Sequence, residues 1–391
     1  MTPDIPRYVS TRSQAFTQSI IREMTRLNNQ YGGVNLAQGF PDFDPPEEIK
    51  EAAIQAIRDG HNQYAITWGT PLLRQAIAEK VGWYNGIIAD PDRHITVTCG
   101  ATEAMMATMM AVVNPGDEVI IFAPYYENYG PDTIVSGAKP VYVTLHAPDF
   151  TFDPTELAAA FSPATKAIVV NTPHNPTGKV FTRDELSLIA DLCQKYDVLA
   201  ITDEIYEHIL YDGFSHVSIA TLPGMAERTV TISGLSKTYS VTGWRIGYVI
   251  APEAISEAVR RVHDFLTVGA PAPLQMAAVT ALRIDRGYYT NLAAQYAQKR
   301  DLLLPILRDL GFTVFTPQGA YYLWTDFSAV SALPDMAFAE FLVRDVGVAT
   351  VPGSGFYHSR ELGAHNIRFT FSKRPETLCA AATRLWEWQR K

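Results

Sequence analysis

The sequence predicts an α/β protein, with a large domain built on a mostly parallel sheet covered by helices and a smaller α+β domain after it. Two patterns support this fold class. Over roughly residues 70–250, short β-branched apolar runs alternate with segments of helical periodicity, as strands and helices do along a parallel sheet. From about Ala281 the pattern changes to a long helix, short strands and a final amphipathic helix.

Six short runs in the middle of the chain are expected to form strands of the larger sheet. They are mostly apolar and bounded by turn residues, as strands buried on both faces are. These runs are Ile95–Thr98, Glu118–Phe122, Ala167–Asn171, Leu199–Thr202, Thr229–Ser233 and Tyr248–Ile250.

Helix signals lie around and between these strands. Asp44, followed by two prolines and Glu47, predicts an N-cap with proline in the first turn of a helix that ends at Gly60. Thr182 and Glu185 have the spacing of a capping box. The later elements are expected to be helices over Tyr289–Leu310 and Glu376–Gln389, and strands around Tyr321–Trp324 and Ile367–Phe371.

Composition argues against several classes of protein. The 391 residues are 47% hydrophobic and 19% charged, which is enough apolar material for a large core. With 32 Lys and Arg against 41 Asp and Glu, the net charge is −9 and there is no basic run, so neither nucleic acid nor an anionic membrane is expected as a partner. The three cysteines, Cys99, Cys193 and Cys379, are far apart, which favours a reducing compartment.

Targeting and membrane signals are also weak. The first ten residues have no apolar core, so no signal peptide is expected. The longest strongly apolar run, Ala104–Val113, is about half the length that crosses a bilayer. These features predict a cytoplasmic protein.

Unusual polar residues follow four of the expected strands. Asn175 comes soon after one strand, Asp203 and Tyr206 follow the next, and Lys237 follows a third. After Ile95–Thr98, the segment 99–103 opens a helix. Because ligands bind at the carboxyl edge of open α/β sheets, these side chains are expected to meet at one site.

The order and spacing of three motifs resemble the class I, fold type I pyridoxal-phosphate aminotransferases of the aspartate aminotransferase type. The motifs are Asn175-Pro176-Thr177-Gly178, Asp203-Glu204-Ile205-Tyr206, and Ser236-Lys237-Thr238-Tyr239 followed by Gly243-Trp244-Arg245. The resemblance extends from Asn35 to Phe369. It implies an N-terminal arm with part of the small domain (1–45), a large cofactor-binding domain (46–280) and a small C-terminal domain (281–391). Residues 37–43 and 171–181 look most like kynurenine/glutamine and methionine aminotransferases.

The residue chemistry is consistent with this resemblance. Lys237 has the primary amine that forms an imine with pyridoxal phosphate and can then move a proton. A buried carboxylate at Asp203 would keep the pyridine nitrogen protonated by charge pairing. The resemblance implies that Tyr206, expected one helical turn after Asp203, and Asn175 donate to the phenolic oxygen of the ring.

The resemblance also implies a phosphate site. Ala101 and Thr102 open a helix whose N-terminus suits a dianion, and Arg245 offers a planar fork of donors. The serine that the family usually has three residues before the lysine is replaced here by Gly234, which leaves Ser236 as the candidate hydroxyl.

Four further residues match family positions around the cofactor and the substrate. Tyr126 matches an aromatic residue that stacks on the ring, and Arg368 matches the arginine that binds the substrate α-carboxylate. Gly39 resembles a backbone contact to the same carboxylate. Tyr64 resembles a tyrosine that reaches the phosphate of the neighbouring subunit, which implies a homodimer with shared active sites.

The expected reaction moves the amino group of an L-amino acid to a 2-oxo acid through a Lys237 imine, in ping-pong order. Large neutral, aromatic or sulfur-containing substrates are favoured by a possible aromatic pocket of Phe16, Phe40, Tyr64, Trp68 and Tyr126. Two alternatives stay open: β-elimination from cysteine conjugates, and an aspartate aminotransferase. The latter would need a second cation from among Arg12, Arg22 and Arg283.

Other functions fit the sequence less well. Glu204 and His208 have i, i+4 spacing on an expected helix, but no HExxH motif accompanies them, so a metal site is not expected. Gly178-Lys179 lacks the other residues of a phosphate-binding loop. A sensor module fused to a DNA-binding domain is disfavoured by the net charge, and a catalytically silent binding protein by the presence of Lys237, Asp203 and Arg368.

Overall fold

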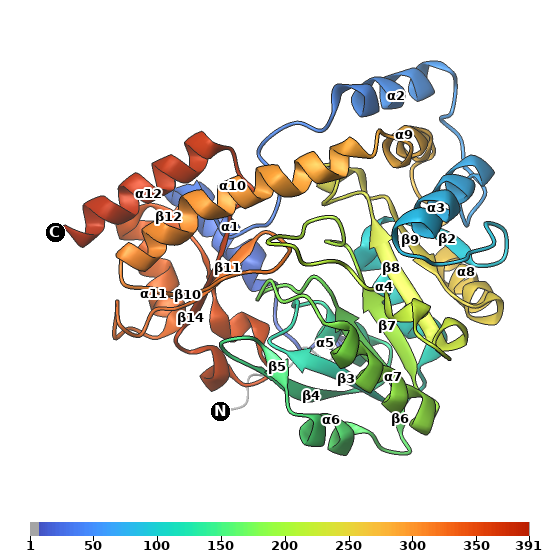
Figure 1. Ribbon diagram of the computed structural model, residues 1–391, viewed down its shortest axis with the longest axis horizontal. Helices are drawn as coiled ribbons and strands as arrows, with labels where there is room; N and C mark the ends of the chain where they lie inside the picture. Colours follow the sequence, from blue (N-terminus) through green and yellow to red (C-terminus); the bar gives the residue numbers. More distant parts are fainter. Residues whose placement is uncertain (1–7, 391) are drawn as a thin grey trace.

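The larger sheet lies in the lower right part of the view in a computed structural model that describes residues 8–390 (Figure 1). Its eight strands lie in the order β2-β9-β8-β7-β6-β3-β4-β5. All six strands expected from the sequence are present. The bounds are β2 Ile95–Thr98, β3 Glu118–Ala123, β4 Lys139–His146, β5 Thr151–Phe152, β6 Thr165–Asn171, β7 Leu199–Asp203, β8 Thr229–Gly234 and β9 Gly247–Ile250.

Strand directions place the carboxyl ends of β2, β6, β7 and β8 at one edge of the sheet. β4, β3, β6, β7 and β8 pair in parallel, whereas β9 is antiparallel to both β8 and β2. The connection from β8 to β9 contains only the short 3₁₀ helix Thr242–Trp244, too little for the crossover that parallel neighbours need. The expected convergence of these strand ends is confirmed.

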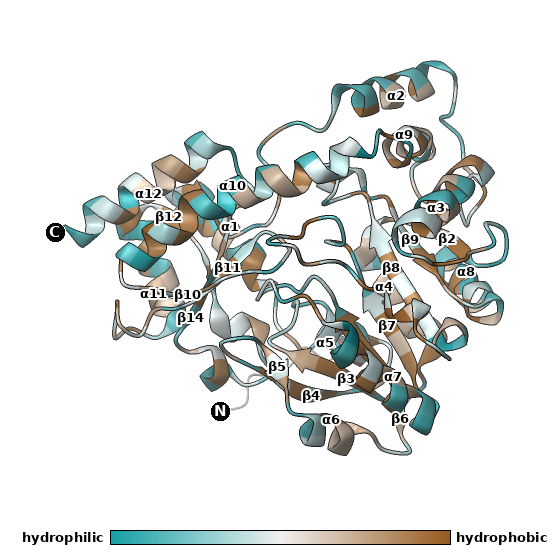
Figure 2. Cartoon of the chain, in the orientation of Figure 1, coloured by the Kyte–Doolittle hydropathy of each residue, from teal (hydrophilic) through white to brown (hydrophobic). Residues whose placement is uncertain are grey.

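Helices cover both faces of this sheet, and Figure 2 shows the strongly apolar strands between them. Apolar residues of α4 (Gly100–Val112), α5 (Tyr129–Val135) and α8 (Glu253–Thr267) pack on one face. Those of α6 (Pro154–Ala160) and α7 (Arg183–Tyr196) pack on the other. The capping box of Thr182 and Glu185 is present at the start of α7.

A second sheet has the order β10-β11-β14-β13 and is antiparallel throughout. β1 pairs in parallel with β12, so an early and a late segment of the chain lie side by side next to this sheet. The bounds are β1 Val34–Asn35, β10 Thr313–Phe315, β11 Tyr322–Asp326, β12 Val348–Ala349, β13 Val351–Pro352 and β14 Asn366–Thr370. The remaining helices are α1 Ile20–Tyr31, α2 Glu47–Arg58, α3 Pro71–Tyr84, α9 Ala272–Leu282, α10 Gly287–Asp309, α11 Asp335–Phe341 and α12 Pro375–Gln389.

The strand pairings do not test the division of the chain into domains at residues 45 and 280, which stays a prediction. Residues 1–7 of the expected arm, where most of the segment considered for a signal peptide lies, are outside the described residues. Across residues 8–390, no helix is long and apolar enough to cross a membrane.

One helix signal was wrong. The N-cap of α2 is Pro46 rather than Asp44, and the Asp44 side chain instead lies 3.4 Å from the Lys50 ammonium. Because residues that precede a proline disfavour helical backbone angles, Pro45 and Pro46 delay the start of the helix to Glu47.

Candidate active site

A cavity of about 470 Å³ lies at the carboxyl edge of the larger sheet. Every site residue expected from the sequence lines it except Tyr64, whose side chain is 87% exposed. The expected residues that it brings together are Gly39, Ala101, Thr102, Tyr126, Asn175, Asp203, Tyr206, Ser236, Lys237, Arg245 and Arg368.

Lys237 follows β8 and points its ammonium into this cavity. Its Nζ donates to the Gly39 carbonyl at 3.3 Å. Burial, together with the nearby guanidinium groups of Arg245 and Arg368, lowers the pKa of Lys237 to about 8, against an opposing effect of Asp203. The neutral, nucleophilic fraction of the amine near neutral pH is therefore much larger than that of an ordinary lysine.

Asp203 ends β7, and its carboxylate is held by two donors. Tyr129 donates its hydroxyl to Oδ2 at 2.8 Å, and the Ile205 N–H donates to Oδ1 at 3.2 Å. Burial raises the pKa of Asp203, and these two hydrogen bonds oppose the rise. Tyr129 lies on α5, 74 residues away in sequence, and sequence reasoning missed it although it stands three residues after Tyr126.

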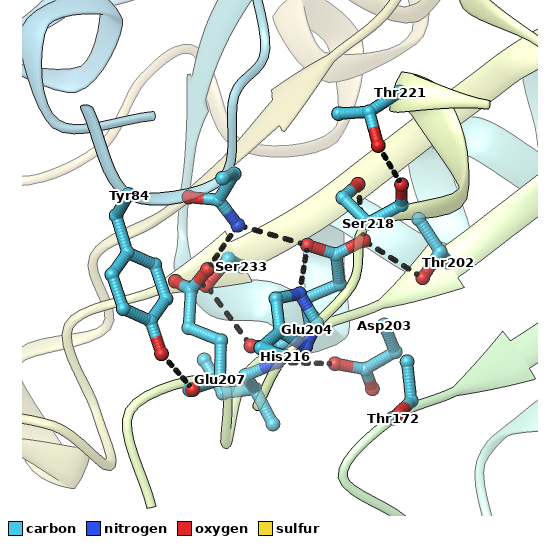
Figure 3. A network of polar contacts seen from close by, with 12 residues as sticks. Tyr84, Thr172, Thr202, Asp203, Glu204, Glu207, His216, Ser218, Thr221 and Ser233 are labelled. Atoms are coloured by element: carbon cyan, nitrogen blue, oxygen red, sulfur yellow. Dashed lines mark hydrogen bonds and ion pairs between the residues drawn. The ribbon is translucent and has the colours of Figure 1, made fainter. Parts of the chain in front are cut away.

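Tyr206 lies in the cavity, but not on the helix that the sequence suggested. The chain after Asp203 forms i→i+3 turns, with hydrogen bonds from Glu207 N–H to Glu204 O and from Ile209 N–H to Tyr206 O. The chain forms turns here because Glu204 and Glu207 are both buried, and their side chains enter one polar network behind the turn (Figure 3).

Glu204 is the first carboxylate of this network. It accepts hydrogen bonds from Ser218 Oγ at 2.7 Å and Asn85 Nδ2 at 3.1 Å, and lies 2.7 Å from His216 Nε2. Because the carboxylate accepts, His216 carries its proton on Nε2 in this contact. Thr202 adds a fourth partner from β7.

Glu207 is the second carboxylate. It pairs with the buried ammonium of Lys80 at 2.5 Å and accepts from Asn85 and Ser233. Burial alone would raise the pKa of Glu207, but Lys80 and the neighbouring histidines outweigh it and lower the pKa to about 2. Breaking a buried pair of this kind typically costs about 3–5 kcal/mol, so the network fixes the turn that carries Asp203 and Tyr206.

The residues with metal-ligating side chains near this turn differ from the pair that the sequence suggested. Glu204 and His208 share no helix; instead Glu204, Glu207 and His216 bring ligand atoms within 4.8 Å of one another. Lys80 and Asn85 donate to the same carboxylate oxygens that a cation would need. This arrangement is that of an internally satisfied ion network.

The N-terminus of α4 forms another wall of the cavity, through Ala101 and Thr102. The guanidinium of Arg245 packs so closely against Gly100 that a Cβ there would overlap it. A Cβ at Gly234 would lie 2.8 Å from the Ile246 carbonyl, which explains why serine is not accommodated at that position. Ser236 lines the cavity instead.

Arg368 projects from β14 and is 1% exposed. It donates to Asn175 Oδ1 at 2.7 Å and to the Ala37 carbonyl at 2.8 Å. Its Nε has no partner among residues 8–390, and a buried charged donor in that state favours an incoming acceptor. The guanidinium lies 4.1 Å from the ring centre of Tyr322, a cavity residue that sequence reasoning missed.

Gly39 faces the same tyrosine. A Cβ at this position would overlap the Tyr322 hydroxyl, so only glycine allows the backbone to approach Tyr322 this closely. That hydroxyl also lies 2.8 Å from the hydroxyl of Tyr206. Tyr322 therefore connects the Gly39 backbone, Arg368 and the turn after β7.

Comparisons with known proteins agree with this geometry. The profile of the family described as "Aminotransferase class I and II" matches residues 31–385. The chain belongs to this family. It is 39% identical to the methionine aminotransferase of Escherichia coli (strain K12), over 94% of this chain and 95% of that protein. It is also 39% identical to kynurenine–oxoglutarate transaminase 1 of Mus musculus, over 94% of each chain.

Solved structures show the same architecture. The structure of N-succinyldiaminopimelate aminotransferase from Mycobacterium tuberculosis matches with a TM-score of 0.94 and 37% identity, covering 96% of this chain and 99% of that one. The fold is therefore the fold type I architecture, and the protein is a pyridoxal-phosphate-dependent aminotransferase.

Proposed function

We propose that this aminotransferase acts on large neutral amino acids, aromatic or sulfur-containing, and passes their amino group to a 2-oxo acid. The observation that carries this proposal is the presence of Phe40 and Tyr126 in the cavity with Arg368. A substrate can place its carboxylate on the guanidinium and its side chain against the aromatic surface. The names of the methionine and kynurenine relatives support the same class. Phe16, Tyr64 and Trp68 are not among the cavity residues.

The residues present fit pyridoxal phosphate. The N-terminus of α4 and the Arg245 guanidinium offer donors and positive charge for a phosphate dianion. Lys237 supplies an amine with a lowered pKa, and Asp203 a buried carboxylate that a protonated ring nitrogen would pair with. When bound, the cofactor supplies the electron sink that stabilises negative charge at the substrate Cα.

The chain's own residues then have separate tasks in the proposed mechanism. Lys237 would hold the cofactor covalently, and its free amine would take up the proton that leaves the substrate Cα and hold it at Nζ. Asp203 would keep the ring nitrogen protonated, and Asn175 and Tyr206 would donate to the phenolic oxygen. Arg368 would orient the substrate through its carboxylate, in the same cavity as the Lys237 amine.

A panel of amino donors tests this proposal. With 2-oxoglutarate as acceptor, methionine, phenylalanine and kynurenine should each give higher kcat/KM than aspartate or alanine, measured as 2-oxo acid formed. Lyase activity is separated by assaying ammonia and pyruvate from a cysteine conjugate. A preference for aspartate, or ammonia release that exceeds transamination, would contradict the proposed substrate class or reaction.

The aspartate alternative depends on one cation. Arg22 lines the cavity, whereas Arg283 pairs with Glu79, and the Arg12 guanidinium donates to the Val135 carbonyl. If Arg22 binds the distal carboxylate of dicarboxylic substrates, Arg22→Gln should raise KM for 2-oxoglutarate by about tenfold. The KM for a monocarboxylic acceptor should change little, and Arg26→Gln is the exposed control on the same helix.

We further propose a homodimer whose partner chain completes each site. Tyr64 lies in a patch of exposed apolar side chains: Tyr64, Ile66, Trp68, Phe265, Leu266 and Val268. His263 connects this patch to α4, since it contacts the Thr67 carbonyl at 2.9 Å and Glu103 in the first turn at 3.0 Å. Exposed apolar surface of this kind is typical of interaction sites.

Mixing Lys237→Ala chains with chains defective at Tyr64 tests whether the two subunits share their active sites. Tyr64→Phe should weaken cofactor binding by about ten- to hundredfold, since it removes a hydrogen bond to a charged acceptor. If Tyr64 reaches the partner's site, heterodimers of Lys237→Ala chains with chains defective at Tyr64 contain one intact site. Random exchange should then restore about a quarter of wild-type activity. No recovery despite demonstrated subunit exchange would place Tyr64 in its own chain's site or outside it.

We also propose that the enzyme works in the cytoplasm. Cys99, Cys193 and Cys379 are free thiols, which is usual for a chain that folds in a reducing compartment. Fractionation of cells that produce the protein, without reductant in the buffer, would test this location.

A further inference from the structure

The loop Ala37–Phe40, between β1 and α2, is held by side chains that come from distant parts of the chain. Its four consecutive carbonyl oxygens all accept hydrogen bonds. The donors are Arg368 to Ala37 O at 2.8 Å, Lys373 to Gln38 O at 3.3 Å and to Phe40 O at 2.8 Å, and Lys237 and Tyr321 to Gly39 O at 3.3 and 2.7 Å.

Lys373 differs from the other two cations of this set. It follows β14, is 2% exposed and is not among the residues that line the cavity. Its ammonium lies 3.8 Å from the ring centre of Phe40, so that it contacts both the backbone and the side chain of a cavity residue. Lys373 therefore acts on the loop from the side away from the site.

Asp42, two residues after the loop, connects the chain to the same segment that carries Lys373. Its carboxylate accepts from the Arg374 N–H and from Thr377 Oγ1, both at 2.6 Å, at the start of α12. A carboxylate is favourable at a helix N-terminus. The segment 38–42 is thus fastened to the region between β14 and α12 at both ends.

We infer that Lys373 is a positioning residue that holds Gly39 and Phe40 in place for the substrate. The inference rests on the proposed function, in which Arg368 binds the substrate carboxylate and Phe40 contacts its side chain, and on the contact to the same carboxylate that the family resemblance implies for the Gly39 backbone. Lys237 and Arg368 have tasks toward the cofactor and the substrate, so their contacts with the loop compete with catalysis. Lys373 and Tyr321 hold the loop without such competition.

Lys373→Met tests this role, because methionine keeps a long apolar side chain and removes the donors. We expect KM for both the amino acid and the 2-oxo acid to rise about tenfold or more, from the loss of hydrogen bonds to a charged donor. kcat should fall less than about threefold, and cofactor affinity and visible absorption should stay at wild-type values. Lys373→Arg, which keeps the charge and donors, should recover part of the KM.

Lys299→Met is the matched control. Like Lys373, Lys299 has its pKa lowered to about 8 by burial and lies over an aromatic ring, that of Phe43 at 3.7 Å. In the described part of the chain its ammonium has no hydrogen bond to residues 37–40. Its KM values should equal those of the wild type.

Hydrogen exchange of the peptide 36–43 provides a readout that needs no turnover. Exchange should be faster in Lys373→Met than in the wild type or Lys299→Met. Unchanged exchange, or a KM within twofold of wild type, overturns the inference, as does a loss of cofactor with KM unchanged. If Lys373→Met does not fold, Lys373→Gln replaces it, with the same outcomes. Failure of the proposed function is seen separately, as absence of transamination by the wild type.

Discussion

Lys237→Ala is expected to lower the transamination rate by about ten-thousand-fold, while the protein stays folded. The variant loses both the amine that binds the cofactor covalently and the base that moves the Cα proton. Lys237 ends in a cavity whose walls already lower its pKa to about 8. The measurement is kcat with the best donor of the panel, together with the visible absorption of the bound cofactor.

Two controls separate chemistry from charge. Lys237→Arg keeps a positive charge, but arginine stays protonated, so this variant should be as inactive as the alanine variant. A small primary amine such as methylamine, added to Lys237→Ala, should restore part of the activity because it can accept the proton. In the wild type, cofactor loading should accelerate as pH rises towards 8, where half of the amine is neutral. Turnover near wild type in Lys237→Ala would contradict the assignment.

The parts of the fold that depend on local pattern were predictable. Each of the six strands of the larger sheet could be located because its apolar run and its flanking turn residues are contiguous in sequence. Since the carboxyl ends of parallel strands share an edge, the same runs predicted that Asn175, Asp203 and Lys237 would meet. The cavity confirms that these residues lie together.

The parts that depend on distant contacts were not predictable. Tyr129 and Tyr322 enter the site from α5 and β11, and no spacing between them and Asp203 or Arg368 indicates those contacts. The direction of β9 was similarly hidden, because its apolar composition is that of the parallel strands, and only the short link before it makes it antiparallel to both neighbours.

The turn after β7 shows why a local pattern failed. Glu204 and Glu207 have the spacing of an exposed helix face, and a local reading places them in water. Lys80, 127 residues before Glu207, offsets part of the cost of burying a carboxylate there. Once both glutamates are buried on one side, a turn is favoured over a helix, and Tyr206 on the other side reaches the cavity.

Asp203→Asn is expected to lower kcat by about 100-fold or more while the cofactor remains bound. The asparagine keeps the size and one acceptor for the Tyr129 hydroxyl, but it lacks the negative charge that pairs with a protonated ring nitrogen. Without that charge the cofactor withdraws electrons less strongly from the substrate Cα. The loss of one preorganised electrostatic group in an active site commonly lowers kcat by about 10²–10³-fold. Stopped-flow measurement of Cα proton removal, with cofactor content measured alongside, tests the effect on the chemical step.

Tyr129→Phe sharpens this test, because it removes one of the two donors that lower the pKa of Asp203 and leaves the carboxylate in place. The pKa of Asp203 should therefore rise further in this variant. The activity of Tyr129→Phe should fall by about tenfold and recover as pH increases, because Asp203 ionises again. Asp203→Asn should show no such recovery, since the amide does not ionise. If Asp203→Asn instead keeps full activity, the carboxylate serves only as a hydrogen-bond acceptor for Tyr129 and the Ile205 N–H, and the turn after β7 contributes structure rather than charge to the reaction.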